Sequence, residues 1–113
     1  MPQSAAVSHL VFARARKGQS EQLGARLLAL IEPSRNTSGC LSFALQNAPQ
    51  DPDLWLISGS WASEDQMKMW LDAPHVQIFS EIVQTFMVSS LDFHTFATEQ
   101  EAQAKASQML RAI

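Results

Sequence analysis

The order in which strand-type and helix-type hydrophobic patterns follow one another limits the folds open to this chain. Alternating apolar and polar residues predict a strand, whereas apolar residues three and four positions apart predict a helix. By this criterion, the sequence changes between the two periods four times over 7–96, without a long linker. The predicted order is strand 7–16, helix 20–33, strands 41–46 and 54–61, a helix pair over 63–86, and strand 89–96.

This order is the split β-α-β arrangement of an α+β, ferredoxin-like fold, in which helices cover one face of a four-stranded antiparallel sheet. We expect the second and third strands to form a hairpin across the loop 47–53. The length of 113 residues suits one domain, which we place at 1–97. A capping box that begins at Thr98 predicts an additional C-terminal helix over 98–113.

The chain carries little charge for its size. Charged residues make up 17% of it, whereas about a quarter is usual. No apolar run approaches the ~20 residues that span a bilayer, so we expect no membrane partner. We assign Trp55, Ile57, Leu41 and Phe43 to both sides of the sheet, which leaves an apolar face uncovered by helices. The sequence therefore predicts a homodimer that forms through the sheet faces.

Several classes of protein are disfavoured. The net charge of −3 argues against a nucleic-acid partner, because such proteins normally present a basic face. Cys40 is the single cysteine and allows no disulfide within the chain, and residues 1–8 lack a secretory pattern, so cytoplasmic residence is expected. His9, His75 and His94 lack the spacing of a zinc site. We predict no metal and no cofactor.

Three segments resemble the antibiotic biosynthesis monooxygenase (ABM) domain family. They are ARARKGQ at 13–19, PSR at 33–35 with GCL at 39–41, and WASE at 61–64 with PH at 74–75. The resemblance extends over 7–96. It implies a dimeric α+β barrel with a ligand cavity between the sheet and the helices of each subunit. It also implies one of three activities: cofactor-independent oxidation of quinols or polycyclic phenols, haem degradation, or isomerisation of a small sugar phosphate.

The chain departs from the pattern of this family at several positions. Gly59 stands where members often have Glu, Trp70 where they often have His, and Phe43 where a Tyr is common. An asparagine and a histidine of the haem-degrading branch fall at Val11 and Ser80, which argues against haem degradation. A sugar-phosphate isomerase would need basic residues in the cavity, and the sequence offers few.

The histidines are the first candidates for proton transfer. His75 belongs to a family-like segment and lies one helical turn before Phe79, so it is the candidate catalytic base. The alternative is a half-exposed histidine that donates to a loop carbonyl. His9 faces either the cavity or the subunit interface. His94 shares a strand face with Asp92, and a structural pair is expected.

Aromatic side chains are expected to line a pocket for a flat ligand. Arg35 is a surface residue or meets an anionic group of the ligand. The candidate pocket residues are Phe43, Trp61, Trp70, Phe79 and Phe86, together with His9 and Arg35. The leading hypothesis is a cofactor-independent monooxygenase that oxidises a quinol or polycyclic phenol. The alternative is a non-catalytic protein of the same fold that binds a small ligand.

Overall fold

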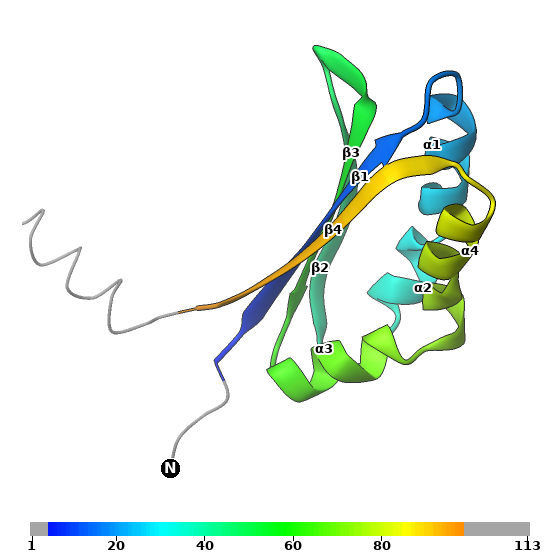
Figure 1. Ribbon diagram of the computed structural model, residues 1–113. Coiled ribbons are helices and arrows are strands. Elements are labelled where there is room, and N and C mark those ends of the chain that lie inside the picture. The colour runs from blue at the N-terminus through cyan, green and yellow to red at the C-terminus, as the bar shows by residue number, and fades with distance from the viewer. Residues whose placement is uncertain (1–4, 99–113) are drawn as a thin grey trace, which may run out of the picture.

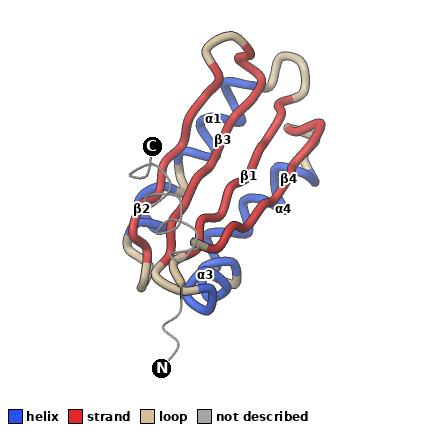
Figure 2. Tube along the Cα trace, turned by 90° about the vertical axis from the view of Figure 1, so that its left-hand side faces the viewer, coloured by secondary structure: helices blue, strands red, loops and turns tan. Residues whose placement is uncertain are grey.

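In the computed structural model, which describes residues 5–98, strand β1 (Val7–Ala15) lies inside an antiparallel sheet. Strand β3 (Asp51–Trp61) pairs with one side of β1, and β4 (Val88–Ala97) pairs with the other. Strand β2 (Cys40–Ala48) pairs with the outer side of β3, which gives the order β2-β3-β1-β4 (Figure 2). The predicted ferredoxin-like arrangement is confirmed.

All helices of the described residues lie on one side of this sheet (Figure 1). They are α1 (Ser20–Leu28), α2 (Ile31–Arg35), α3 (Glu64–Leu71), the short 3₁₀ helix η1 (Pro74–Gln77) and α4 (Ile78–Gln84). None of these helices is long and apolar enough to cross a bilayer. The predicted helix over 98–113 lies outside the described residues except for Thr98, whose backbone N–H donates to the carbonyl of Ala6.

The first helical segment is divided into α1 and α2, whereas the sequence pattern predicted one helix that Pro33 ends. Pro33 lies inside α2. It has no N–H to donate to the carbonyl of Ala29, and its ring crowds that carbonyl, so the helix is interrupted four residues earlier. There the N–H groups of Ala29 and Leu30 donate three residues back instead of four. The interruption allows α2 to pack against β2 with Ser34 fully buried.

The hairpin between β2 and β3 is longer than predicted. Most of the expected loop 47–53 is strand, and the turn is confined to Pro49 and Gln50. The amide of Asn47 donates to the carbonyls of Pro52 (2.9 Å) and Leu54 (3.0 Å), which holds the two strands together beyond the regular register. These bonds depend on cross-strand proximity, and local sequence patterns do not reveal them.

Helix α3 begins after an N-cap serine, Ser63. The backbone N–H of Gln66 donates to Oγ of Ser63 (3.2 Å), which satisfies one of the free donors at the helix start. Pro74 occupies the first position of η1, where its missing N–H costs nothing. These signals fix where the helices over the sheet begin, and therefore which residues of α3 and α4 face it.

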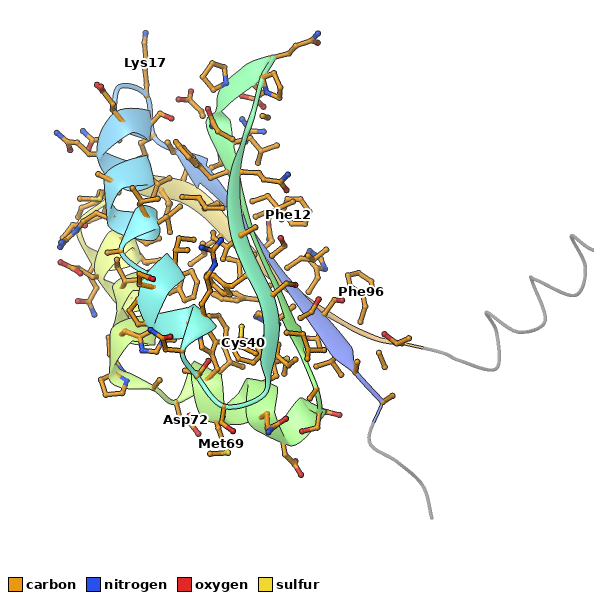
Figure 3. The ribbon with its side chains drawn as sticks, turned by 180° about the vertical axis from the view of Figure 1, so that it is seen from behind. Phe12, Lys17, Cys40, Met69, Asp72 and Phe96 are labelled. Atoms are coloured by element: carbon orange, nitrogen blue, oxygen red, sulfur yellow. The ribbon has the colours of Figure 1, made fainter. Side chains whose placement is uncertain are left out.

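The sheet has two faces of different character. The inner face, which the helices cover, is formed by Val7, His9, Val11, Ala13, Phe43, Leu45, Trp55, Ile57, Gly59, Trp61, Leu91, Phe93 and Thr95. The open face is formed by Ser8, Leu10, Phe12, Arg14, Ala44, Gln46, Leu54, Leu56, Ser58, Ser60, Asp92, His94 and Phe96. Figure 3 shows Phe12 and Phe96 on the side away from the helices.

Apolar residues do occur on both faces, but three of the four residues named for them from the sequence lie on the same face. Trp55 and Ile57 are two positions apart on β3, and Phe43 lies on the same side because it pairs with Gly59. All three therefore belong to the inner face. Leu41 lies at a register shift of β2 and is exposed. The apolar side chains of the open face come from other positions: Leu10, Phe12, Leu54, Leu56 and Phe96.

Candidate functional site

Five buried rings from five different elements meet between the inner face and the helices. Trp70 of α3 lies at their centre. Its ring centroid is 5.2 Å from that of Trp61, 5.6 Å from Phe43, 5.8 Å from His9 and 6.3 Å from Phe79. The structure thus brings together the candidate pocket residues of β1, β2, β3, α3 and α4. We call these five residues the ring cluster.

His9 lies inside the protein, between the sheet and the helices, and therefore does not face a subunit interface. Its side chain is 5% exposed, and Nδ1 is 2.8 Å from Oγ1 of Thr95 on the neighbouring strand β4. The same hydroxyl donates to Sδ of Met67 on α3 at 3.8 Å. Burial lowers the pKa of His9 below its ordinary value, and the nearby charge of His94 lowers it further. The imidazole is therefore neutral at neutral pH.

Two buried nitrogen atoms of the ring cluster have no hydrogen-bond partner among residues 5–98. They are Nε2 of His9 and Nε1 of Trp61. Both side chains flank Gly59, which pairs with His9 on one side and with Phe43 on the other. A Cβ atom at Gly59 would lie 3.2 Å from Nε1 of Trp61 and 3.0 Å from Cδ1 of Phe43. Nearly all buried polar groups in proteins are paired, so these two need an explanation.

His75 reaches the ring cluster only through a serine. Its Nε2 lies 3.4 Å from Oγ of Ser34, and that hydroxyl accepts a hydrogen bond from Nε1 of Trp70 at 2.8 Å. The imidazole is half-buried, and burial lowers its pKa. The partner is thus a buried hydroxyl and not the loop carbonyl of the alternative prediction.

The remaining candidates lie outside the ring cluster. Arg35 is exposed, and its Nε donates to the carbonyl of Phe43 at 3.1 Å, so it braces β2. Phe86 is 67% exposed beneath the guanidinium of Arg16 and is not part of the pocket wall. His94 packs on Phe12 and Phe96 of the open face, and within residues 5–98 no hydrogen bond or ion pair joins it to Asp92.

Sequence reasoning missed three residues that shape this site. Ser34 was noted only as part of a family-like segment, although it is fully buried and joins Trp70 to His75. Thr95 holds His9, and Phe93 lies 5.9 Å from the His9 ring. Only the pairing of β1 with β4 places the last two beside His9. A period-2 pattern indicates which residues share a face but not which strands are neighbours.

Two of the surface grooves on the helix side of the sheet differ in how near they lie to the ring cluster. The smaller, of about 330 Å³, lies between α4 and β4 and shares Phe79 and Phe93 with the surroundings of the ring cluster. The larger, of about 640 Å³, lies between α1 and the hairpin, where the Trp55 indole closely approaches Gly24. It has no residue of the ring cluster in its wall. Of these two grooves, the one beside α4 borders the ring cluster, through Phe79.

The described residues also bear on metal binding. Within residues 5–98, no three or more His, Cys, Asp or Glu side chains come together in a way that could hold a metal ion. Cys40 is half-buried, and burial raises the pKa of its thiol. The groups that face the ring cluster are thus uncharged aromatic rings, hydroxyls and a thioether.

The sequence matches the family model "Antibiotic biosynthesis monooxygenase" over residues 6–82. Among solved structures, PA3566 of Pseudomonas aeruginosa is 21% identical with a TM-score of 0.78, covering 88% of this chain and 99% of its own. A Deinococcus radiodurans protein, provisionally described as an antibiotic biosynthesis monooxygenase, is 20% identical with a TM-score of 0.74, covering 84% and 93%. A Chloroflexus aurantiacus protein with the same provisional description is 28% identical with a TM-score of 0.65, covering 84% and 94%. No curated protein matches. The family model covers about two thirds of the chain, and the solved structures share its fold. The chain therefore belongs to the antibiotic biosynthesis monooxygenase domain family.

Proposed function

We propose that this protein is a cofactor-independent monooxygenase whose substrate is a quinol or a polycyclic phenol. The observation that carries the proposal is a neutral, buried imidazole, His9, set among aromatic rings beside Trp70 and Phe93. Flat aromatic ligands stack on such rings, and a neutral imidazole can accept a phenolic proton. Membership of the family gives the fold, whereas the reaction has to be argued from these residues.

The proposed reaction depends mainly on an electron-rich substrate, because the substrate itself supplies the electrons that reduce O₂. Loss of the phenolic proton gives an anion that can pass an electron to O₂. Recombination at a ring carbon that carries a hydrogen gives a hydroperoxide there, and loss of water from it leaves a carbonyl. One oxygen atom enters the substrate, the other leaves as water, and the substrate supplies all four electrons. The protein has to hold the ring, accept the proton and exclude water.

The two histidines differ in how they could serve this reaction. His9 lies among the rings, and its Nε2 has no partner within residues 5–98. His75 is separated from the rings by the hydroxyl of Ser34. We therefore assign the role of proton acceptor first to His9. His75, the first candidate from the sequence, is proposed to act through Ser34 on the position of Trp70.

A second candidate function is non-catalytic binding of a small aromatic ligand. The observation that favours it is the chemistry of the ring cluster, which contains no carboxylate and no cationic side chain. Gly59 offers no group for proton transfer where relatives often carry Glu. A protein of this kind would bind phenols and rise in thermal stability without consuming oxygen.

A second copy of the chain is proposed to cover the open face. Members of the family commonly form dimers. Leu10, Phe12, Leu54 and Leu56 are half-buried there, and Phe96 is 55% exposed. Apolar side chains that gather on one face of a sheet without helices over them favour an interface with another chain. Cytoplasmic residence stays a prediction.

Oxygen uptake tests the proposed reaction. Purified protein is mixed with a panel of hydroquinones and hydroxyanthrones, and O₂ consumption is compared with buffer and with heat-denatured protein. We expect uptake above both controls for at least one polycyclic phenol, without added metal or flavin. Uptake equal to buffer for every compound, together with a ligand-induced rise in Tm, would reject the monooxygenase in favour of the binding protein.

A further inference from the structure

We infer that the groove between α1 and the β2–β3 hairpin binds a small organic cation, an ammonium group carried on a flat apolar body. The groove shares no residue with the ring cluster, so this site is separate from that of the proposed function and does not depend on it. Its volume of about 640 Å³ lies in the usual range of small-molecule pockets. Its wall comes from the first turns of α1, the end of β2 and the start of β3.

The apolar part of the wall includes the half-buried indole of Trp55, which lies against the backbone of α1. A Cβ atom at Gly24 would be only 2.5 Å from Cη2 of that indole, so the contact requires glycine inside a helix. Leu28, 63% exposed, and the half-buried Leu45 extend the apolar wall. Flat apolar molecules pack well on such groups, and an indole attracts ammonium groups more strongly than other aromatic rings do.

The side-chain donors of the wall already have acceptors within the protein. Nε1 of Trp55 donates to Oγ of Ser20 at 3.0 Å, and that hydroxyl donates to the carbonyl of Pro52. The amide nitrogen of Asn47 donates to the carbonyls of Pro52 and Leu54, which uses both of its hydrogens. Among the described residues, the wall therefore keeps no side-chain N–H or O–H group for a ligand.

The polar side-chain groups that remain in the wall are acceptors, and two of them are negatively charged. Glu21 and Asp53 belong to the wall, and neither forms an ion pair within residues 5–98. The start of α1 attracts negative charge, but Glu21 in its first turn already supplies it. A complementary ligand therefore donates hydrogen bonds and carries a positive charge, and an ammonium group does both.

Two cationic side chains near the groove leave this negative charge uncompensated. Arg14 is close enough to Asp53 to interact with its charge, but Asp51 already holds the guanidinium through two hydrogen bonds, of 3.2 and 2.9 Å. Lys17, which precedes Gly18 of the wall, points away from the body of the molecule (Figure 3). The charge of the groove is therefore left for a ligand.

Three compounds with the same indole ring test the preference for a cation. Tryptamine carries an ammonium group, tryptophol a hydroxyl in the same place, and indole-3-acetate a carboxylate. Binding to the ¹⁵N-labelled full chain is followed through the indole N–H resonances, with that of Trp55 assigned from the Trp55→Phe variant. We expect tryptamine to shift the Trp55 resonance and to bind about fivefold or more tightly than tryptophol. Indole-3-acetate should bind more weakly than either.

Matched variants test where the cation binds. Asp53→Asn and Glu21→Gln keep the shape of each side chain and remove its charge, and the double variant should reduce the preference for tryptamine to about twofold or less. Asp72→Asn removes an exposed carboxylate at the other end of the molecule (Figure 3) and should leave the preference unchanged. Ala25→Trp places a bulky side chain into the groove from an exposed position of α1 and should weaken the binding of all three compounds.

The inference is overturned if tryptamine at millimolar concentration leaves the Trp55 resonance unshifted, if tryptophol binds as tightly, or if the double variant keeps the preference. Shifts of the Trp61 and Trp70 resonances alone also overturn it, because the ligand would then occupy the ring cluster. Should the double variant fail to fold, salt decides on the native protein, where raising NaCl from about 50 to 500 mM has to reduce the preference. Oxygen uptake plays no part in this test, so the proposed function can fail without it.

Discussion

The two faces of the sheet are made from alternate residues of the same strands, yet they differ in how far they are completed. On β1, Val7, His9 and Val11 are buried by helices, whereas Leu10 and Phe12 of the open face are only half-buried. The side chains of the inner face pack against aromatic rings from the helices, and these contacts form the ring cluster. The open face still presents apolar side chains, which shows that alternation assigns residues to faces but does not decide what covers them.

We expect the largest difference in stability between the two faces when one aromatic ring is removed from each. Trp70→Ala deletes a fully buried indole with four ring neighbours and is expected to lower the free energy of unfolding by about 3–5 kcal/mol. Phe96→Ala should cost less than about 1 kcal/mol in the separate subunit. Urea denaturation at several protein concentrations measures both, since only the effect of Phe96→Ala should depend on concentration. Equal, concentration-independent losses would contradict the difference between the faces.

A charge on the open face should separate subunits without unfolding them. Phe12→Asp would bury an unpaired carboxylate in each half of a two-fold interface, and we expect dimer affinity to fall by roughly 100-fold or more. Sedimentation velocity measures the change, and circular dichroism checks that the fold is retained. Thr37→Asp, on the loop after α2, is the control and should leave the dimer intact. A native protein that is monomeric at all concentrations would rule out the proposed dimer.

Removing one serine hydroxyl on each side of the sheet should produce a smaller difference in the free energy of unfolding. Ser34→Ala leaves Nε1 of Trp70 buried without its acceptor, so we expect a loss of about 1–3 kcal/mol in the free energy of unfolding. The matched change on the open face, Ser58→Ala, should stay within about 0.5 kcal/mol. Chemical denaturation measures both. Ser34→Ala should also shift the imidazole resonances of His75, which a purely local packing defect would leave in place.

The smallest expected effect is a dependence of stability on pH. Burial lowers the pKa of both His9 and His75 below about 6.5, so the unfolded chain binds more protons than the folded one just below that pH. Stability is therefore greatest above about pH 6.5 and falls as the pH drops from there toward the lowered pKa values of the folded state. Tm measured from about pH 8 to 5 should show this fall. The double variant His9→Phe, His75→Phe should flatten it, and an unchanged slope would show that other groups are responsible.

Local signals predicted the elements well because each depends on nearby residues. The N-cap serine of α3, Ser63, and the proline at the start of η1 act within one helical turn. The interruption at Ala29 escaped prediction because a proline acts on the carbonyl four residues before it, so Pro33 divides the helix instead of ending it. The hairpin escaped for a different reason, since the bonds of Asn47 cross between strands.

The candidate site was predictable in its composition but not in its arrangement. The aromatic inventory indicated a pocket wall, and Phe43, Trp61, Trp70 and Phe79 do come together. The sequence did not show which histidine lies among the rings. It depends on whether His9 points inward and on Ser34 standing between His75 and the rings, and both follow from packing between distant segments.

The sequence alone determined the ferredoxin-like order of elements, the family, and the alternation that gives the sheet two different faces. Those properties follow from short-range periodicity and from segments read along the chain. Only the tertiary structure decided that His9 and Trp61 are buried beside Gly59, each with a ring nitrogen that has no partner among residues 5–98. Strand register and helix placement, which act between residues far apart in sequence, set this arrangement. A buried polar atom becomes informative only when its neighbours are known.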